Sequence, residues 1–149
     1  MGRLERSLLE AAGEGETKTL LKLLKAGADP KAKTEFGETA LHLAGICMPS
    51  CPKSVEMLEG LIVFGADVNA RATAKAALRM APLHWYVHPG WTAGVKVLIE
   101  NGADVNMVVD NEQGEQITAL DIVEMIGETR DDVAEVLRAA GAKRYADLP

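Results

Sequence analysis

The pentapeptide GADVN occupies residues 65–69 and, unchanged, residues 102–106. A shorter copy, GADP, begins at Gly27, and a further remnant, GAK, begins at Gly141. The starts of the four copies are 38, 37 and 39 positions apart. Near-constant spacing in this range indicates structural units that repeat and stack against one another.

A helical pattern precedes each copy. Apolar residues three and four positions apart form one stripe on a helix. The stripes are Leu20, Leu23 and Leu24; Leu58, Leu61 and Ile62; Val95, Leu98 and Ile99; and Val133, Val136 and Leu137. The glycine that opens each copy accepts the left-handed backbone that ends a helix. Each stripe is therefore predicted to lie on a helix that ends at its glycine.

A second helix is predicted downstream of three copies, at TALH (residues 39–42), APLH (81–84) and TALD (118–121). A threonine ahead of an apolar run caps the free amides of the first turn. Pro82 suits the first helical position because it lacks an amide hydrogen. Each unit is thus expected to consist of a loop followed by two helices.

These segments resemble ankyrin repeats. GETALHLAG at residues 37–45 is similar to the family's G-x-T-P-L-H-x-A, and LIVFGADVN and LIENGADVN are similar to its helix-ending L-L-x-x-G-A-D-V-N. The resemblance implies an all-α ankyrin-repeat solenoid of stacked helix-turn-helix pairs with projecting β-hairpin or finger loops. In that pattern, structural roles fall to Thr39, His42, Gly65, His84, Gly102 and Thr118.

The resemblance also implies a domain organisation. We expect one ankyrin-repeat domain at residues 1–142 and a C-terminal tail at 143–149. The first and last repeats are expected to be degenerate caps. The repeat boundaries are expected at about 4–27, 28–65, 66–102 and 103–142.

Composition bounds the class of protein. The 149 residues suit one domain, and an apolar content of 48% is enough for a core that needs no metal or disulfide. The net charge of −6 disfavours nucleic acid and anionic membranes as partners. No apolar run approaches the roughly 20 residues of a membrane span, and the charged N-terminal segment is unlike a secretory signal. We expect a cytoplasmic monomer with no membrane association.

The repeat spacing exceeds the family's unit of about 33 residues, which indicates insertions in loops. One insertion, GICMPSCPKS at residues 45–54, contains Cys47 and Cys51. Without export signals, two reduced thiols are the favoured interpretation. A small disulfide and a zinc site that includes His42 are the alternatives, although a metal site needs three or four suitably spaced ligands.

Two further insertions lengthen neighbouring finger loops of opposite charge. The basic finger, ARATAKAALRM at residues 70–80, carries Arg71, Lys75 and Arg79 and no acid, and its alanines favour a short helical turn. The acidic finger, MVVDNEQGEQI at residues 107–117, is predicted to form a hairpin. Its acids are Asp110, Glu112 and Glu115. These charges either pair with each other or form a polarised edge that steers a partner.

Three of the six aromatic residues cluster in APLHWYVHPGW at residues 81–91. By the family's pattern, Trp85 faces the concave groove, where it either anchors a partner or packs against the alkyl stems of the basic finger. Tyr86 and Trp91 are expected to pack between helices.

The supply of catalytic groups is poor, and no enzyme activity, cofactor or metal is expected. His42 and His84 belong to the repeat motif, which leaves His88 uncommitted. Asn69 and Asn106 lie in a Leu-x5-Asp-Val-Asn pattern that resembles the hydroxylation sites of ankyrin repeats. The alternative is that these asparagines only serve the turn of the repeat.

The favoured function is a non-enzymatic protein-protein interaction module, an adaptor or inhibitor, that binds another protein through the concave face formed by fingers and first helices. One alternative is a bacterial immunity-type protein that masks a basic toxin. Another is a redox- or metal-responsive switch built on Cys47 and Cys51. The predicted partner-binding residues are Arg71, Lys75, Arg79, Trp85, His88, Asp110, Glu112 and Met125.

Overall fold

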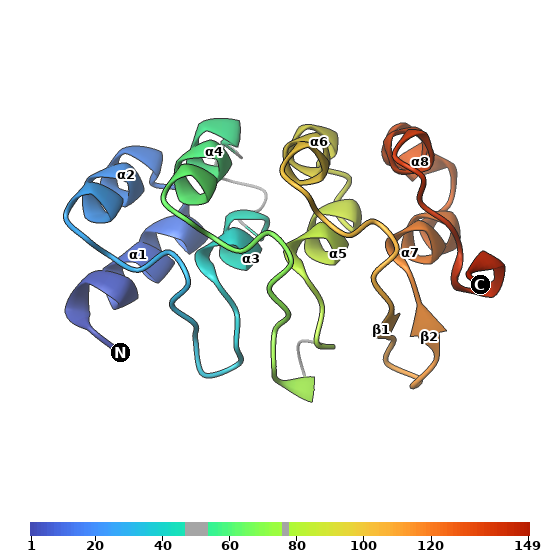
Figure 1. Ribbon diagram of the computed structural model, residues 1–149, viewed down its shortest axis with the longest axis horizontal. Coiled ribbons are helices and arrows are strands. Elements are labelled where there is room, and N and C mark those ends of the chain that lie inside the picture. Colours follow the sequence, from blue (N-terminus) through green and yellow to red (C-terminus); the bar gives the residue numbers. More distant parts are fainter. Residues whose placement is uncertain (47–53, 76–77) are drawn as a thin grey trace.

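The computed structural model describes residues 1–46, 54–75 and 78–149 of the chain. Successive helices form pairs whose members lie in two rows (Figure 1). The lower row consists of α1 (Arg3–Glu14), α3 (Ala40–Ala44), α5 (Pro82–Val87) and α7 (Ala119–Ile126). The upper row consists of α2 (Thr17–Lys25), α4 (Val55–Val63), α6 (Thr92–Glu100) and α8 (Asp131–Ala139). The finger loops project below both rows.

Each helix contacts its partner in the pair and the equivalent helix of the next pair. In the lower row α1 contacts α3, α3 contacts α5, and α5 contacts α7. In the upper row α2 contacts α4, α4 contacts α6, and α6 contacts α8. The predicted all-α ankyrin solenoid of stacked helix pairs is therefore confirmed. One pair cannot bury its apolar stripe alone, so the stacking stabilises all of them.

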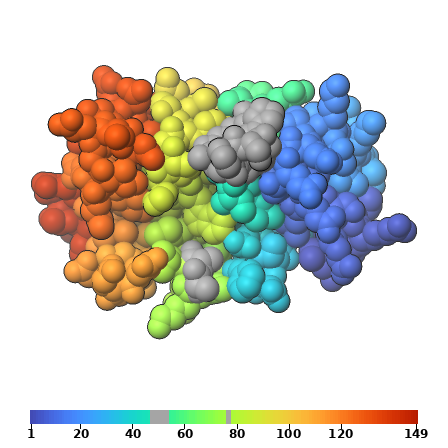
Figure 2. Space-filling model, turned by 180° about the vertical axis from the view of Figure 1, so that it is seen from behind, coloured from blue at the N-terminus to red at the C-terminus, as the bar shows by residue number. Residues whose placement is uncertain are grey.

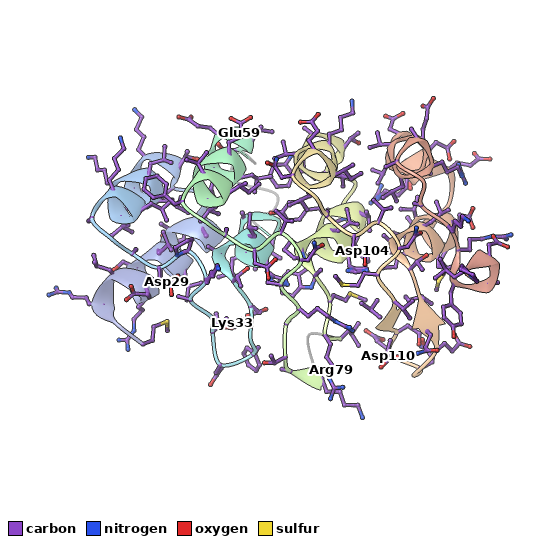
Figure 3. All side chains as sticks on the ribbon, viewed as in Figure 1. Asp29, Lys33, Glu59, Arg79, Asp104 and Asp110 are labelled. Carbon is purple, nitrogen blue, oxygen red and sulfur yellow. The ribbon has the colours of Figure 1, made fainter. Side chains whose placement is uncertain are left out.

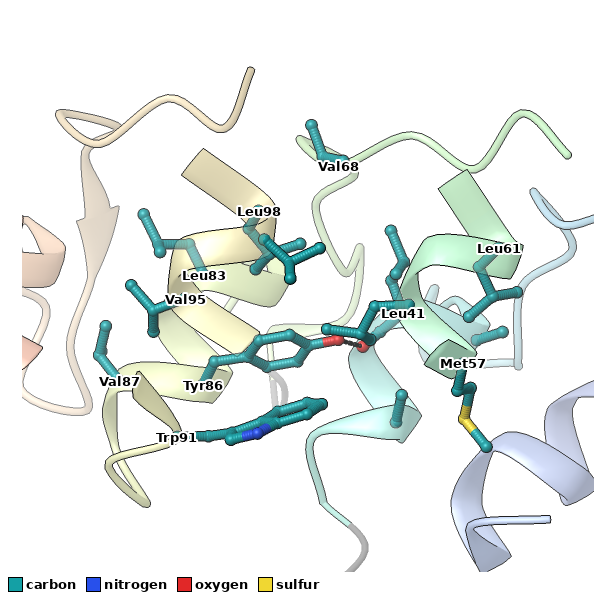
Figure 4. Close-up of a cluster of buried hydrophobic side chains, with 14 of the residues drawn as sticks. Leu41, Met57, Leu61, Val68, Leu83, Tyr86, Val87, Trp91, Val95 and Leu98 are labelled. Carbon is teal, nitrogen blue, oxygen red and sulfur yellow. Dashed lines mark hydrogen bonds between the residues drawn. The ribbon is translucent and has the colours of Figure 1, made fainter. Parts of the chain in front are cut away.

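The core runs between the two rows as one continuous cluster. Apolar side chains from every pair contribute to it, including Leu8, Leu41, Leu83, Leu98 and Leu137. At the boundary between the second and third pairs, the side chain of Tyr86 is buried and its hydroxyl donates a hydrogen bond to the carbonyl of Leu41 (Figure 4). Trp91 packs on the Tyr86 ring, with ring centroids 4.9 Å apart. The predicted burial of Tyr86 and Trp91 is confirmed.

The glycine of each repeated copy ends an upper-row helix. Gly27, Gly65, Gly102 and Gly141 have φ angles of 100°, 105°, 93° and 88°. These values lie in the left-handed region, where a side chain is strained and glycine is not. The backbone therefore explains why the same letter recurs at these four places.

The motif histidines link successive pairs. The amide of Thr39 donates to Nδ1 of His42, so Nε2 of that ring carries the proton and hydrogen-bonds to the carbonyl of Met80, 2.8 Å away. His84 repeats the arrangement one pair later: the Ala81 amide donates to Nδ1, and Nε2 lies 3.4 Å from Met107 O.

In the last repeat, Asp121 occupies the place of the histidine. Its Oδ2 accepts from the amide of Thr118 at 2.9 Å, and Thr118 Oγ1 donates to the carbonyl of Lys143 at 2.7 Å. This carboxylate lies in the first turn of α7, where the helix dipole favours negative charge.

Neighbouring fingers also contact one another. The carbonyl of Phe36, in the first finger, accepts hydrogen bonds from the amides of Thr73 and Ala74 in the basic finger. The acidic finger contains the predicted hairpin, in which β1 (Val109–Asp110) pairs antiparallel with β2 (Gln116–Ile117). The first and the basic finger are thus held side by side.

The C-terminal residues fold back against the acidic finger. They form a short 3-10 helix, η3 (Tyr145–Asp147), and the Tyr145 hydroxyl donates to Oε1 of Gln116 at 2.6 Å. The amide of Tyr145 also donates to Oδ2 of Asp121 at 2.8 Å. Within the residues that the structure describes, no helix combines the length and the apolar character needed to cross a membrane.

Candidate partner-binding face

Trp85 is presented by α5, which starts with Pro82 at its first position. The indole meets the imidazole of His42 edge to face, with ring centroids 5.0 Å apart and ring planes at 75°. The side chain is only partly buried and packs against the core. The preceding helix pair thus fixes the ring and leaves part of its surface open.

A cavity of about 930 Å³ lies beside Trp85, and we call it the inner cavity. Its volume falls in the range of pockets that bury a small ligand, about 300–1,000 Å³. The apolar wall residues come from the segment after α3, from the basic finger, from α5 and the turn after it, and from α7: Ile46, Leu78, Met80, Trp85, Pro89, Ile122 and Met125. The polar wall residues include His88, Glu112 and Arg130. Figure 2 shows the molecule from behind, with the fingers along its lower edge.

A second cavity of about 810 Å³, the outer cavity, lies between the basic and the acidic finger. Lys75 and Arg79 line it from the basic finger, and Asp110 and Glu112 line it from the acidic finger. Figure 3 shows Arg79 and Asp110 on these neighbouring fingers. The two cavities share four wall residues, Leu78, Asn111, Glu112 and Gln113, so they adjoin each other, and together we call them the groove.

The opposite charges of the two fingers do not neutralise each other. All three cations and all three acids are among the described residues, and no ion pair in that part of the chain joins them. Glu115 is instead held by its own turn, since Oε2 accepts from Nδ2 of Asn111 at 2.9 Å. The sequence left two interpretations of the finger charges open, and the first of them, mutual pairing, is not found among the described residues.

The basic finger has an unusual backbone where it returns to α5. Leu78 and Arg79 have φ angles of 55° and 52°, although neither is glycine. Two successive left-handed residues of this kind cost free energy and are held in place by their surroundings. Nε of Arg71 donates to the Arg79 carbonyl at 2.9 Å, which clamps the finger across its neck. As a result, Leu78 faces both cavities and Arg79 faces the outer one.

Seven of the eight predicted partner-binding residues line the groove. Trp85, His88, Glu112 and Met125 lie on the inner cavity, and Lys75, Arg79, Asp110 and Glu112 lie on the outer one. Met125 is 71% exposed. Arg71 is the exception, because it lines a separate cavity of about 360 Å³ with Lys31 and Lys33.

Sequence reasoning missed Arg130, Leu78, Met80 and Ile122 as groove residues. Arg130, at the end of η2 (Glu128–Arg130), reaches back to the preceding helix pair, where its Nε donates to the carbonyl of His88 at 2.8 Å. No local pattern signals that contact. Leu78 and Met80 did carry a signal, since they are large apolar residues in an otherwise basic loop.

The motif histidines are buried in the stack. Burial lowers the pKa of His42 to about 4, although its hydrogen bond to the Met80 carbonyl opposes the shift. Burial lowers the pKa of His84 to about 4 as well, although its hydrogen bond to the Met107 carbonyl opposes the shift. Both rings are therefore neutral at pH 7 and hold the repeats together.

Asn69 and Asn106 join successive repeats through both the oxygen and the nitrogen of their side-chain amides. Oδ1 of Asn69 accepts from the amide of Asp104 at 2.7 Å, and Nδ2 donates to the Gly102 carbonyl at 3.0 Å. Asn106 makes the same pair of contacts with Lys143 N and Gly141 O, at 2.7 and 3.2 Å. These bonds give the asparagines a structural role, and their hydroxylation stays a prediction.

Cys47 and Cys51 lie outside the described residues, so the predictions about their redox state and the switch built on them stay predictions. Among the residues that the structure does describe, His, Cys, Asp and Glu side chains form no group suited to hold a metal ion.

A sequence profile described as ankyrin repeats, in three copies, matches residues 8–108. The chain is 32% identical to the E3 ubiquitin-protein ligase KEG of Arabidopsis thaliana over 121 residues, which cover 80% of this chain and 7% of the ligase. It is 30% identical to the cyclin-dependent kinase 4 inhibitor B of Rattus norvegicus over 106 residues, which cover 71% of this chain and 75% of the inhibitor.

A third relative, the transient receptor potential cation channel subfamily V member 6 of Rattus norvegicus, is 31% identical over 145 residues. The match covers 68% of this chain and 19% of the channel. The chain therefore spans a small part of the ligase and of the channel, and most of the kinase inhibitor.

Proposed function

The chain belongs to the ankyrin-repeat family, and from this premise we propose that it is an adaptor or inhibitor that binds one partner protein in the groove formed by the inner and outer cavities. The family and the kinase-inhibitor relative point to a non-catalytic protein-protein interaction module. The likeness to the cyclin-dependent kinase 4 inhibitor B over three quarters of that protein supports the inhibitor form. We propose that the protein acts in the cytoplasm as a monomer.

One observation carries the choice of the groove. A partly open tryptophan lies in an apolar cavity, next to two fingers whose opposite charges do not pair with each other. Tryptophan in a desolvated pocket is a frequent energetic centre of interfaces, and unpaired charges around it orient the partner. The exposed Met125 extends the apolar surface, and methionine adapts readily to a partner's shape.

The proposal is tested by capture from the native host. One bait is the wild type, and a second carries Trp85→Ala and Arg79→Glu. A matched control carries Phe64→Ala and Lys96→Glu, which also remove an exposed aromatic ring and reverse a cation, but on the upper row of helices. The groove variant is expected to recover the partner at least tenfold less well, since truncation of an interface tryptophan costs about 2 kcal/mol or more. Equal recovery by the wild type and the groove variant would show that the partner binds elsewhere.

A further inference from the structure

The groove has two chemically different halves. The inner cavity is mostly apolar and has Trp85 and Met125 in its wall, whereas the outer cavity has charged walls. Four shared wall residues join the halves, and each half alone has the volume of a small-ligand pocket. Two adjoining cavities of this volume suit an extended segment of a partner protein better than a single small ligand.

The charges in the outer cavity are arranged by sign. Lys75 and Arg79 lie on one wall, and Asp110 and Glu112 lie on the other. In the described part of the chain, these four side chains make no ion pair with each other or with any other residue. A segment with charges of one sign would be attracted by one wall and repelled by the other. A segment with one charge of each sign would be attracted by both.

The strained backbone of the basic finger supports this assignment independently. Leu78 and Arg79 are the two non-glycine residues of the described chain with positive φ; Leu78 lines both cavities, and Arg79, the next residue, lines the outer one. Left-handed backbone at such residues costs free energy and is concentrated at functional sites. Here the left-handed backbone turns the apolar side chain of Leu78 toward the groove. It does the same for the cationic side chain of Arg79.

We propose, building on the function proposed above, that the bound segment combines three features. It places one large apolar side chain in the inner cavity beside Trp85. It then places a carboxylate toward Lys75 and Arg79, and a cation toward Asp110 and Glu112. Because both signs are required, the segment is selected by its charge pattern and not by its net charge.

The test uses a random linear dodecapeptide library displayed on phage, selected on four baits of the full chain. The baits are the wild type, a cation-wall variant (Lys75→Glu and Arg79→Glu), an acid-wall variant (Asp110→Lys and Glu112→Lys), and a control (Lys22→Glu and Lys96→Glu) whose changes lie on exposed positions of α2 and α6. Thermal unfolding of each bait, followed by circular dichroism, verifies that it is folded before selection.

Wild type and control are expected to enrich peptides with a large apolar residue flanked by an acid and a base. The cation-wall variant is expected to lose the preference for the acid and keep that for the base, and the acid-wall variant is expected to do the reverse. One peptide selected on the wild-type bait is then synthesised with a fluorescent label. It is expected to bind each wall variant about tenfold more weakly than it binds the control, because a reversed charge turns attraction into repulsion.

Three results would overturn the charge pattern: enrichment of peptides of a single sign, enrichment that is the same on all four baits, or no enrichment on the wild type. These outcomes differ from failure of the proposed function. If capture from the host depends on Trp85 but selection shows no dependence on the walls, the groove binds its partner without the acid-base pair. If capture does not depend on Trp85, the groove itself is not the site.

Discussion

Gly45 and Tyr86 fit against each other across the boundary between the second and third helix pairs. A Cβ atom built on Gly45 would lie 2.4 Å from Cε1 of Tyr86, and the ring is fully buried beneath it. Gly45 has a φ of −85°, which any residue adopts, so only the contact with the ring excludes a side chain. The two residues form one packing unit, although they are 41 positions apart.

Replacement of Gly45 by alanine is therefore expected to destabilise the protein by about 1–3 kcal/mol, because the added methyl group must displace a buried ring. Urea unfolding measures the change. Gly13→Ala is the matched control: Gly13 lies within α1 and has nothing within 4 Å of an added Cβ, so alanine should stabilise by about 0.5–1 kcal/mol. A Gly45→Ala protein as stable as the wild type would refute the packing unit.

Replacement of Asn69 by alanine removes both hydrogen bonds that join it to the next repeat. The expected loss in the free energy of unfolding is about 1–2 kcal/mol, since each bond contributes about 0.5–1.5 kcal/mol net. The urea concentration at the unfolding midpoint should fall, while the slope of the unfolding free energy against urea concentration stays constant. An unchanged midpoint would mean that water replaces these bonds at no cost.

Lys31 occupies in the first copy the position of Asn69 and Asn106. Its backbone makes the same turn, with the amide 2.9 Å from Asp29 Oδ1, as the Asn69 amide does with Asp67 Oδ1. Lys31→Asn is therefore expected to add the missing link to the next repeat and to stabilise by about 1 kcal/mol. Lys31→Ala is the control, since it removes the lysine without offering an amide. Equal stability of the two variants would contradict the predicted link.

The buried histidines make stability fall in mild acid. The folded pKa of His42 and His84 is about 4, below the ordinary 6.5, so the unfolded chain binds protons that the folded chain does not. The contribution of the neutral histidines to the free energy of unfolding is fully present above about pH 6.5 and is lost as the pH falls toward 4. The expected loss between pH 7.5 and 5 is about 2 kcal/mol for each histidine.

Urea unfolding at a series of pH values measures that loss. Because carboxylates titrate mainly below pH 5, this window reports the histidines. The His42→Gln variant should have a lower free energy of unfolding than the wild type at pH 7.5. Between pH 7.5 and 5 it should lose about half as much as the wild type loses. Wild-type stability that is constant from pH 7.5 to 5 would show that the rings are not held neutral.

The sequence predicts those parts of the molecule that depend on local pattern. The apolar stripes and the left-handed glycines located the upper-row helices, and the apolar ends of the acidic finger, which flank a polar region around Gly114, located the hairpin. These features follow from backbone geometry within a few residues. The family's pattern assigned the motif histidines to the repeat structure, and in the structure both rings are buried and hydrogen-bonded.

Contacts that no periodic pattern signals, whether within a finger or between repeats, could not be predicted in the same way. The clamp from Arg71 to the Arg79 carbonyl, and the reach of Arg130 to His88, join residues through space with no periodic signal. The clamp also explains why Arg71 lies apart from the other predicted binding residues. The left-handed backbone at Leu78 and Arg79 was equally hidden, because neither residue favours that conformation by itself.

Amide hydrogen exchange of the protein, alone and bound to the partner recovered by capture, tests the central claim most directly. Binding in the groove predicts slower exchange at residues 78–88 and 107–126, which carry most of the wall residues of both cavities, and unchanged exchange in α2, α4 and α6. Slower exchange confined to those upper-row helices, with the fingers and α5 unaffected, would contradict it.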